Sequence, residues 1–306
     1  MLRVTLLCAL LVLGSAGVLV SCSSGQLWVV NTLARNGDYL VQADIPYGTD
    51  PRQRLDLYQP AASVPSARMT LVFVPGGCWG ACDTFPKDDY RFIADTFTAH
   101  GYTVVIPNYR LFPAYGFADI IADVAAAVDL IYRAAGRGAG YRQSASGAER
   151  TFGGGQMVAL LALDERYLQP DTRQQLTGWI GLAGPYDFLP FTEDYQPALF
   201  APESRYPDSQ PVNFVDGGEP PALLLYGRDD VRVKPRNILS LSARLQAQGV
   251  PHQALCYDGI DHAGGSLALS RPLRDTRPVL ADMLRFLQQL EQGPPDTRLA
   301  EVSCRQ

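Results

Sequence analysis

MTLVFVPGGCWG, which runs from Met69 to Gly80, is the stretch of the chain that decides the fold. Its first half is apolar and β-rich, and the run breaks at Gly76 and Gly77. A short apolar run that ends in turn residues is typical of a buried strand. Glycine permits backbone turns that other residues resist, so a Gly-Gly turn after a strand can aim backbone N–H groups at a ligand. We therefore expect a strand here, followed by a turn with functional N–H groups.

Strands and helices alternate on both sides of this stretch. Short apolar runs predict strands at 50–60, 102–109, 178–184, 222–230 and 252–262, and helical spacing of apolar residues predicts helices at 117–135, 238–249 and 278–292. This alternation indicates the α/β class, with a mostly parallel central sheet and helices on both faces. In such a sheet ligands bind beyond the carboxyl ends of the strands, so residues directly after each strand are candidates for a functional site.

The length of 306 residues and the composition bound the class of protein. We expect one α/β domain over 44–292, a linker at 22–43 and a flexible tail at 293–306; two smaller domains are the weaker alternative. The net charge of −5 and the lack of any Lys/Arg run argue against nucleic acid as a partner. No motif indicates a metal or an organic cofactor, and the oligomeric state stays open.

The N-terminal segment MLRVTLLCALLVLGSAGVLVSC has the pattern of an export signal. Arg3 precedes an apolar run from Val4 to Val20, and a small residue and Cys22 follow it. A transmembrane anchor is the alternative, but the run is at the short limit for crossing a bilayer and has no basic stop after it. Residues 19–22, LVSC, resemble the lipobox of bacterial lipoproteins. We therefore expect a signal peptide at 1–21 and an exported cell-envelope lipoprotein, periplasmic or on the outer face, held only through acyl chains on Cys22.

Four cysteines lie beyond this segment, namely Cys78, Cys82, Cys256 and Cys304, while Cys8 falls within the leader. Cys78 and Cys82 are four residues apart without a matching His or Cys pair nearby, which argues against zinc. Export would permit disulfides, but we expect buried free thiols.

Candidate acid and base residues follow two of the predicted strands. His262 comes after the last strand through the turn DGID, and Asp229 and Asp230 follow the apolar run LLLYG. A buried carboxylate there can hold the imidazole in the tautomer that accepts a proton from a nucleophile. The alternatives are a loop histidine bonded to backbone, and aspartates that cap the next helix. We interpret His100 and His252 as surface or capping residues.

Five segments match motifs of one known family. They are Pro75 to Trp79 for HGG-x-W, Tyr109 to Pro113 for YRL-x-P, Gly184 to Pro190 for G-x-YDF-x-P, Gly227 to Val233 for G-x-x-D-x-x-V, and Gly259 to His262 for G-x-x-H. Together they resemble the α/β-hydrolase esterases, the group of the hormone-sensitive-lipase-like carboxylesterases and kynurenine-formamidase-like enzymes. The resemblance covers about 44–290 and implies the α/β-hydrolase fold, with a serine, Asp230 and His262 in that chain order. It also implies a small ester substrate, and an oxyanion hole at Gly76, Gly77, Cys78 and the residue after the serine.

Two positions depart from the family pattern. Pro75 replaces the histidine of HGG, whose part is more structural than chemical. The nucleophile elbow G-x-S-x-G is missing: the match places its serine at Phe152 and its flanking glycines at Arg150 and Gly154, with Gly153 as the last oxyanion donor. The strand before the elbow is also replaced by polar QSASGAE, 143–149. We expect an altered strand there, with unpaired ladder groups that cost several kcal/mol.

The missing serine has two candidate explanations in the sequence. Ser144 and Ser146 lie nearby, but they lack flanking glycines and a leading strand, so we interpret them as loop residues. The other explanation uses the genetic code. If 150–154 is encoded CGG ACA TTC GGC GGG, a frame one base later gives Gly-His-Ser-Ala-Gly, and TCT GGC GCT GAG at 146–149 becomes Leu-Ala-Leu-Ser. Several codons encode each of these residues, so the genetic code permits this reading but does not require it. We hypothesise compensating frameshifts near 135–145 and near Gly154, in the gene or in its reading.

Two functions of different class follow from these patterns. The first is an exported, lipid-anchored serine esterase that is impaired as written, with amide hydrolysis of the formamidase kind as a lesser variant. The second is a catalytically inactive relative that binds ligands or partners at the cell envelope. A purely structural lipoprotein explains neither the Gly-Gly turn nor the order of acid and base.

Overall fold

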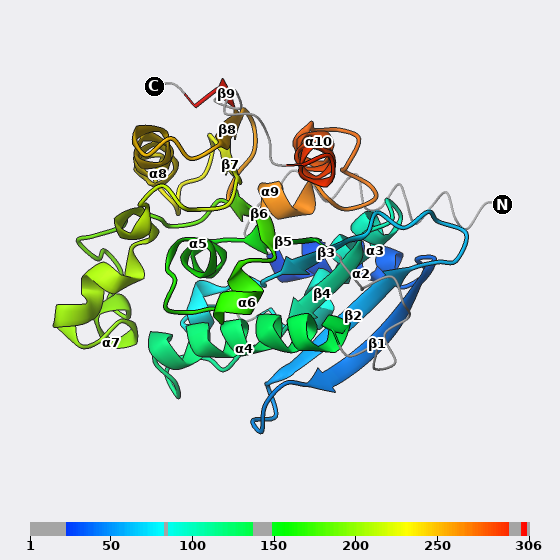
Figure 1. The fold of residues 1–306 in the computed structure, drawn as a ribbon, viewed down its shortest axis with the longest axis horizontal. Coiled ribbons are helices and arrows are strands. Elements are labelled where there is room, and N and C mark those ends of the chain that lie inside the picture. Colours follow the sequence, from blue (N-terminus) through cyan, green and yellow to red (C-terminus); the bar gives the residue numbers. More distant parts are fainter. Residues whose placement is uncertain (1–22, 83–84, 137–148, 294–300, 305–306) are drawn as a thin grey trace, which may run out of the picture.

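The computed structural model describes residues 23–82, 85–136, 149–293 and 301–304 (Figure 1). Within them, nine strands form one sheet in the order β1-β2-β4-β3-β5-β6-β7-β8-β9. Only the β1–β2 and β2–β4 pairs are antiparallel, so the prediction of a mostly parallel sheet is confirmed. The strands are β1 (Tyr39–Pro46), β2 (Arg54–Pro60), β3 (Met69–Phe73), β4 (Thr103–Pro107), β5 (Glu149–Gly154), β6 (Leu176–Leu182), β7 (Ala222–Gly227), β8 (His252–Tyr257) and β9 (Glu301–Val302).

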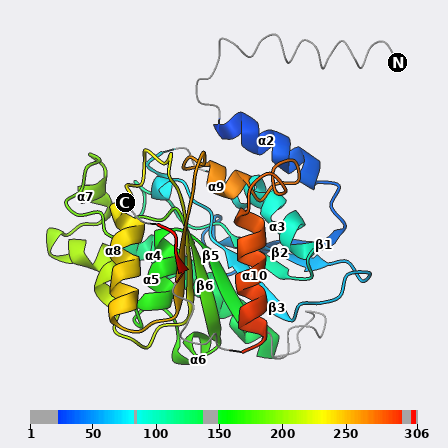
Figure 2. The same cartoon turned by 90° about the horizontal axis from the view of Figure 1, so that it is seen from above.

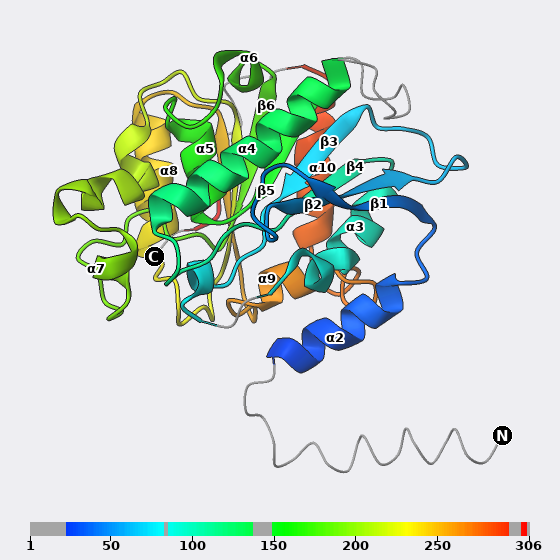
Figure 3. The same ribbon diagram turned by 90° about the horizontal axis from the view of Figure 1, so that it is seen from below.

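Helices cover both faces of this sheet (Figures 1 and 3). One face carries α4 (Phe117–Gly136), α5 (Gln156–Leu163) and α8 (Arg236–Ala247), and the other carries α3 (Arg91–Thr98) and α10 (Val279–Glu291). The shorter elements are α6 (Pro170–Arg173), α7 (Gln196–Leu199), α9 (Gly264–Leu267) and the 3₁₀ turns η1 (Cys78–Gly80), η2 (Lys87–Tyr90), η4 (Glu203–Ser209) and η5 (Pro211–Phe214). The α/β architecture expected from the alternating pattern is therefore present.

Two separate hydrophobic cores form because side chains alternate along each strand. In β7, Leu224 belongs to the core beneath α4, α5 and α8, whereas Leu223 and Leu225 belong to the core beneath α3 and α10. In β3, Val72 and Leu71 divide in the same way. A central strand of this kind is apolar on both sides, which explains why the predicted strands are continuous apolar runs.

Most of the described part, 23–43, of the segment predicted as a linker, 22–43, is structured instead. It holds helix α2 (Ser23–Ala34) and the first residues of β1, which begins at Tyr39. Leu27 and Val30 are buried on the side of α2 that packs on α3, and Asn31 Oδ1 accepts the Phe92 N–H at 3.2 Å. The leader, including Cys8 and Cys22, lies outside the described residues. None of the helices in the described part of the chain is long and apolar enough to cross a membrane.

A strand fills the place between β3 and β6 where we expected polar, unpaired chain. Residues 149–154 form β5, in which Phe152 is in register with Val72 on one side and Trp179 on the other. The expectation of unpaired ladder groups is therefore wrong for these residues. The reason is that a parallel ladder is built from backbone N–H and C=O groups, which any residue except proline supplies in full. Ser144 and Ser146 lie outside the described residues.

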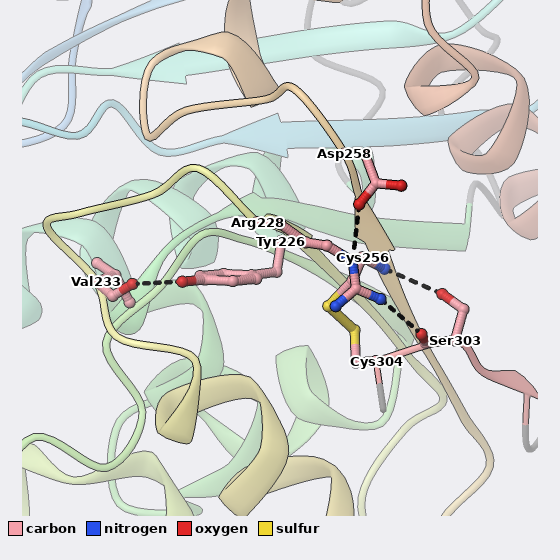
Figure 4. The surroundings of a disulfide bond; sticks show 7 residues. All are labelled: Tyr226, Arg228, Val233, Cys256, Asp258, Ser303 and Cys304. Atoms are coloured by element: carbon pink, nitrogen blue, oxygen red, sulfur yellow. Dashed lines mark hydrogen bonds and ion pairs between the residues drawn. A yellow bond between two sulfur atoms is a disulfide. The ribbon is translucent and has the colours of Figure 1, made fainter. Parts of the chain in front are cut away.

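The four cysteines form two disulfides rather than the expected free thiols. Cys78 bonds Cys82, and Cys256 in β8 bonds Cys304 near the C-terminus. Figure 4 shows the second bond, with Ser303 beside it: its Oγ accepts the Cys256 N–H at 3.1 Å. β9 also pairs with β8. The predicted flexible tail at 293–306 is thus wrong for 301–304, which are fixed to the edge of the sheet.

Removing the Cys256–Cys304 bond should destabilise the fold more than removing the Cys78–Cys82 bond. The first closes a loop with a sequence separation of 48 and the second one of 4. Loop-closure entropy then gives losses of about 4 kcal/mol for Cys256→Ala with Cys304→Ala, and about 2 kcal/mol for Cys78→Ala with Cys82→Ala. Urea unfolding of both pairs measures this. Equal losses of unfolding free energy in the two double variants would contradict it. So would a urea midpoint of the unchanged chain that stays the same when reducing agent is added.

Candidate active site

The structure brings together the predicted acid and base. His262 Nδ1 lies 2.8 Å from Asp230 Oδ2, although the two residues follow different strands, β7 and β8. The Asp230 side chain is fully buried and the His262 side chain is 40% exposed. Since the carboxylate only accepts, Nδ1 carries the hydrogen, which leaves Nε2 with its lone pair. A histidine held in this way can take a proton from a nucleophile.

The loop that carries Asp230 is fixed by hydrogen bonds within it. Asp230 Oδ1 accepts the N–H groups of Arg232 at 2.8 Å and Val233 at 2.9 Å. The buried Tyr226 hydroxyl donates to the Val233 carbonyl at 2.9 Å (Figure 4). Burial, and secondarily the charge of Asp230, raises the pKa of Tyr226, so the phenol stays a donor. The neighbouring Asp229 is exposed, so the structure selects Asp230 from the two candidates.

Close approach of two backbone segments explains the glycine of the G-x-x-D motif. A Cβ on Gly227 would lie 2.1 Å from the carbonyl oxygen of Ile260, in the turn that leads to His262. The Asp229 N–H donates to that same carbonyl at 3.1 Å. A side chain at Gly227 would push the acid loop and the base loop apart, so glycine here sets the acid–base distance.

The other two histidines lie away from this pair. His100 is exposed, and its Nδ1 lies 2.8 Å from the Thr96 carbonyl at the end of α3, as a capping residue should. His252, which we also expected to be a surface or capping residue, is only 2% exposed. Its Nδ1 donates to the Val250 carbonyl at 3.0 Å, and Nε2 accepts from the Ser242 hydroxyl at 2.9 Å. A surface position for His252 is therefore wrong, because its ring is buried and bonds Ser242 of α8.

His252 should make the fold less stable in acid. Burial lowers its pKa below the ordinary 6.5, so the folded protein keeps the ring neutral where the unfolded chain binds a proton. The stabilisation is complete above pH 6.5 and is lost as the pH falls below it. We expect His252→Gln to remove about 1 kcal/mol of the drop in unfolding free energy between pH 7.5 and pH 5.5. Urea titrations at both pH values test this, with the exposed His100→Gln as control. An unchanged drop in His252→Gln would contradict it.

The predicted turn after β3 has an unusual backbone. Gly77, Cys78, Trp79 and Gly80 all have positive φ, and two of these are not glycine. A left-handed conformation costs a non-glycine residue free energy and marks a backbone held for a purpose. The N–H groups of Gly77 and Cys78 donate to no other described residue. The backbone of Gly76, in contrast, hydrogen-bonds the Tyr90 phenol, so Gly76 is the weakest of the three predicted oxyanion donors.

Three contacts hold this turn. The first is the disulfide that joins Cys78 to Cys82. The YRL-x-P segment supplies the other two: the Tyr109 hydroxyl donates to the Pro75 carbonyl at 2.7 Å, and the Phe112 N–H donates to the Trp79 carbonyl at 2.9 Å. The motif residues therefore maintain the shape of the turn.

Gln156, the first residue of α5, joins three parts of the candidate site. Its Oε1 accepts the Trp79 indole N–H at 3.1 Å, and its Nε2 donates to the Ser209 carbonyl at 2.6 Å. The Gln156 side chain is buried, so these bonds fix the β3 turn and the η4 segment to the helix that follows β5. Sequence reasoning missed this residue because its partner Trp79 is 77 positions away. The only indication in the sequence was that Gln156 closely follows residues 150–154, which align with the nucleophile elbow of the family.

An aromatic wall lies beside the turn. The Trp79 ring stacks on Phe188 with centroids 6.4 Å apart and meets Phe200 edge-on at 5.3 Å. Phe188 belongs to the G-x-YDF-x-P segment, which Asn237 positions by accepting the N–H groups of Tyr186 and Asp187. An apolar surface of this kind can receive the hydrocarbon part of a substrate.

The predicted nucleophile position does not lie at a turn. Phe152 and Gly153 are within β5, and Gly153 is in register with Phe73 and Ile180. Gly155 forms the junction between β5 and α5, with φ −99° and ψ −131°. As written, Phe152 and Gly153 therefore lie in a strand and form no nucleophile elbow. The ladder takes up the residues before Gly155, so the strand extends through the segment that forms the elbow in the family.

The described residues also bear on other kinds of chemistry. No group of three or more His, Cys, Asp or Glu side chains among them could hold a metal ion. What these residues offer is an acid–base pair, two backbone donors and an apolar wall around a strand-to-helix junction. This set is suited to acyl transfer through a tetrahedral intermediate, except that no nucleophile stands at the junction.

A family model and several characterised proteins match this chain. The family model BD-FAE matches residues 55–245. The chain is similar to esterase LipC of Mycobacterium tuberculosis, with 24% identity over 85% of this chain and 68% of that protein. It is also similar to isoprenylcysteine alpha-carbonyl methylesterase ICME of Arabidopsis thaliana, at 24% identity over 79% of this chain and 60% of the relative, and to kynurenine formamidase of Danio rerio, at 25% over 50% and 48%.

Solved structures support the fold. Esterase B from Lactobacillus Rhamnosis superimposes with a TM-score of 0.66 at 17% identity, covering 88% of this chain and 93% of that one. A truncated carbohydrate esterase from gut microbiota gives a TM-score of 0.68 at 17% identity, covering 84% and 98%. The prediction of the α/β-hydrolase fold is confirmed.

Proposed function

Because the chain belongs to the BD-FAE family, we propose that it derives from a serine-dependent carboxylic-ester hydrolase and is impaired as written. The observation that carries this proposal is the Asp230–His262 pair, 2.8 Å apart and oriented for proton transfer. The names of the similar proteins, esterase LipC and the methylesterase ICME, support an ester substrate. A small acyl or aryl ester suits the aromatic wall beside Trp79.

In the intact enzyme each group has a defined role. A serine at the elbow attacks the ester carbonyl, and His262 Nε2 takes its proton. The N–H groups of Gly77 and Cys78, with that of the residue after the serine, bind the oxyanion. His262 then returns the proton to the leaving alcohol, while Asp230 keeps the imidazole oriented and stabilises its charged form. Water then attacks the acyl-enzyme while His262 takes its proton, and the carboxylic acid is released as that proton returns to the serine oxygen.

We propose that compensating frameshifts around the elbow account for the missing serine. Supporting it, the acid, the base and the turn with positive φ all persist around a position that has no nucleophile. A serine hydrolase without its serine gains nothing from maintaining a buried Asp–His pair and a strained turn.

A catalytically inactive binding protein is the second candidate. A specific observation favours it: β5 pairs on both sides with the residues as written, so the chain forms a complete sheet without correction. Such a protein would bind ester-like ligands at the aromatic wall without turnover. Amide hydrolysis is a lesser variant of the first candidate, supported by similarity to kynurenine formamidase. In each case we propose an exported lipoprotein anchored through Cys22.

Sequencing the gene across the codons for residues 134–157 separates the two candidates. Two compensating single-base indels, with a corrected frame that encodes Gly-His-Ser-Ala-Gly after an apolar strand, would establish the esterase. Confirmation of the written codons would leave an inert relative and end the catalytic proposal for this chain.

A further inference from the structure

Helix α2 has apolar residues on both of its faces. Its sequence, SSGQLWVVNTLA, contains no charged residue. Leu27, Val30 and Ala34 are buried on one side. On the other side Trp28 is 66% exposed, Val29 49% and Leu33 46%. A surface helix of a water-soluble protein normally turns a charged or polar face outward, so this outer face calls for a second partner.

The outer face is made more apolar by one hydrogen bond. The Thr32 hydroxyl donates to the Trp28 carbonyl at 2.7 Å, so the polar group of Thr32 is turned back to the helix. Arg35 follows directly after the helix and is exposed. At helical spacing it lies seven positions from Trp28, on the same side. An indole and a guanidinium beside exposed aliphatic side chains suit the boundary between acyl chains and anionic headgroups.

The position of α2 in the chain indicates what covers this face. The described part of helix α2 reaches back to Ser23, and the residues before it in the sequence are the apolar run 4–20 and Cys22. Whether the anchor is acyl chains on Cys22 or the run itself, no linker separates it from α2. A lipoprotein with a flexible tether could stand away from its membrane, but a helix that begins next to the anchor must lie within a few residues of the bilayer.

From these observations we propose that the Trp28, Val29 and Leu33 face of α2 docks on the lipid bilayer and orients the domain. Figures 2 and 3 place α2 at the same end of the molecule as α9, which begins shortly after His262. Docking therefore holds the carboxyl-end edge of the sheet, with the acid–base pair, toward the membrane surface. The proposal does not depend on ester hydrolysis, since no residue of the acid–base pair takes part in docking.

Tryptophan fluorescence of the full, membrane-anchored chain tests this docking. The protein is reconstituted in phosphatidylethanolamine and phosphatidylglycerol vesicles, with or without brominated acyl chains. The chain has three tryptophans, and the difference between the unchanged chain and Trp28→Phe isolates Trp28. We expect bromolipid to quench the Trp28 signal and vesicles to shield it from iodide, because the indole lies in the interface. Trp179 is fully buried and should respond to neither quencher.

Variants that keep Trp28 then test the rest of the face. Val29→Ser with Leu33→Ser should lower the ratio of docked to undocked protein on the order of tenfold, because apolar area is withdrawn from lipid. Val29→Ile with Leu33→Met keeps the apolar area and should leave quenching unchanged. Val29 and Leu33 are exposed, so both double variants should keep the fold intact, which thermal unfolding checks.

Two results would overturn the proposal. One is a Trp28 that iodide reaches and bromolipid does not, while the chain remains with the vesicles. The other is a Trp28 shielded from both quenchers in a way that depends on protein concentration, because a second copy or another protein would then cover the face. Neither result bears on the esterase proposal, which the elbow sequence tests.

Discussion

Replacing residues 146–154 by LALSGHSAG should raise kcat/KM for p-nitrophenyl acetate by about 10⁴-fold or more over the chain as written. The replacement supplies an apolar strand end and puts a serine at the position of Phe152. The other groups that the proposed reaction requires are present: Asp230 and His262 are 2.8 Å apart, and the N–H groups of Gly77 and Cys78 donate to no other described residue. Steady-state hydrolysis with both proteins at equal concentration measures the effect.

A matched control separates the nucleophile from the repaired strand. The block LALSGHAAG differs only at position 152, where alanine stands in place of serine. It should fold like the active block but hydrolyse no faster than the written chain. If the serine block folds with the same unfolding midpoint and remains inactive, the arrangement around the elbow is not that of a serine esterase.

In the restored chain, Asp230→Asn should lower kcat about 10⁴-fold with little change in KM. The amide cannot hold His262 with a hydrogen on Nδ1 as the carboxylate does, and it cannot stabilise the imidazolium that forms in the transition state. The loss should fall on kcat because the aspartate is buried behind the histidine and does not touch the substrate. Michaelis–Menten kinetics over a range of ester concentrations separate the two parameters.

Asp229 provides the control for this substitution. It is adjacent to Asp230 but exposed, so Asp229→Asn should leave kcat within about twofold of the restored chain. A comparable loss in Asp229→Asn would assign the acid role to the wrong residue. A restored enzyme that tolerates Asp230→Asn would mean that His262 acts without an oriented partner.

The sequence predicts the architecture well because the strands of a covered parallel sheet must be apolar on both faces. The runs that become β3, β7 and β8 stand out for that reason, and the residues directly after them include Gly77, Asp230 and His262. Local pattern offered Asp229, Asp230 and His262 as candidates, and the family motifs selected Asp230 and His262 from them. The distance between Asp230 and His262 could be learned only from the structure. It depends on the close approach of Gly227, at the end of β7, and Ile260, which follows β8.

The misses have physical causes. Helix α2 has no polar face, and its apolar residues follow an apolar leader. The spacing of apolar residues therefore did not reveal a separate helix in this segment. β5 is held by backbone hydrogen bonds, which residue type predicts poorly. The Cys256–Cys304 bond depends on β9 returning to the edge of the sheet, a contact that cysteine spacing does not reveal. Gln156 became part of the site only when its buried bond to Trp79 was visible.

Covalent labelling with an alkyl fluorophosphonate, read by mass spectrometry, is the most direct measurement of whether this fold holds an esterase site around a missing nucleophile. We expect no adduct on the chain as written. The LALSGHSAG chain should gain one phosphonyl group, located at position 152, and should lose most of that labelling when His262→Ala is added. An adduct on the written chain, or a restored chain that stays unlabelled while correctly folded, would contradict the proposed function.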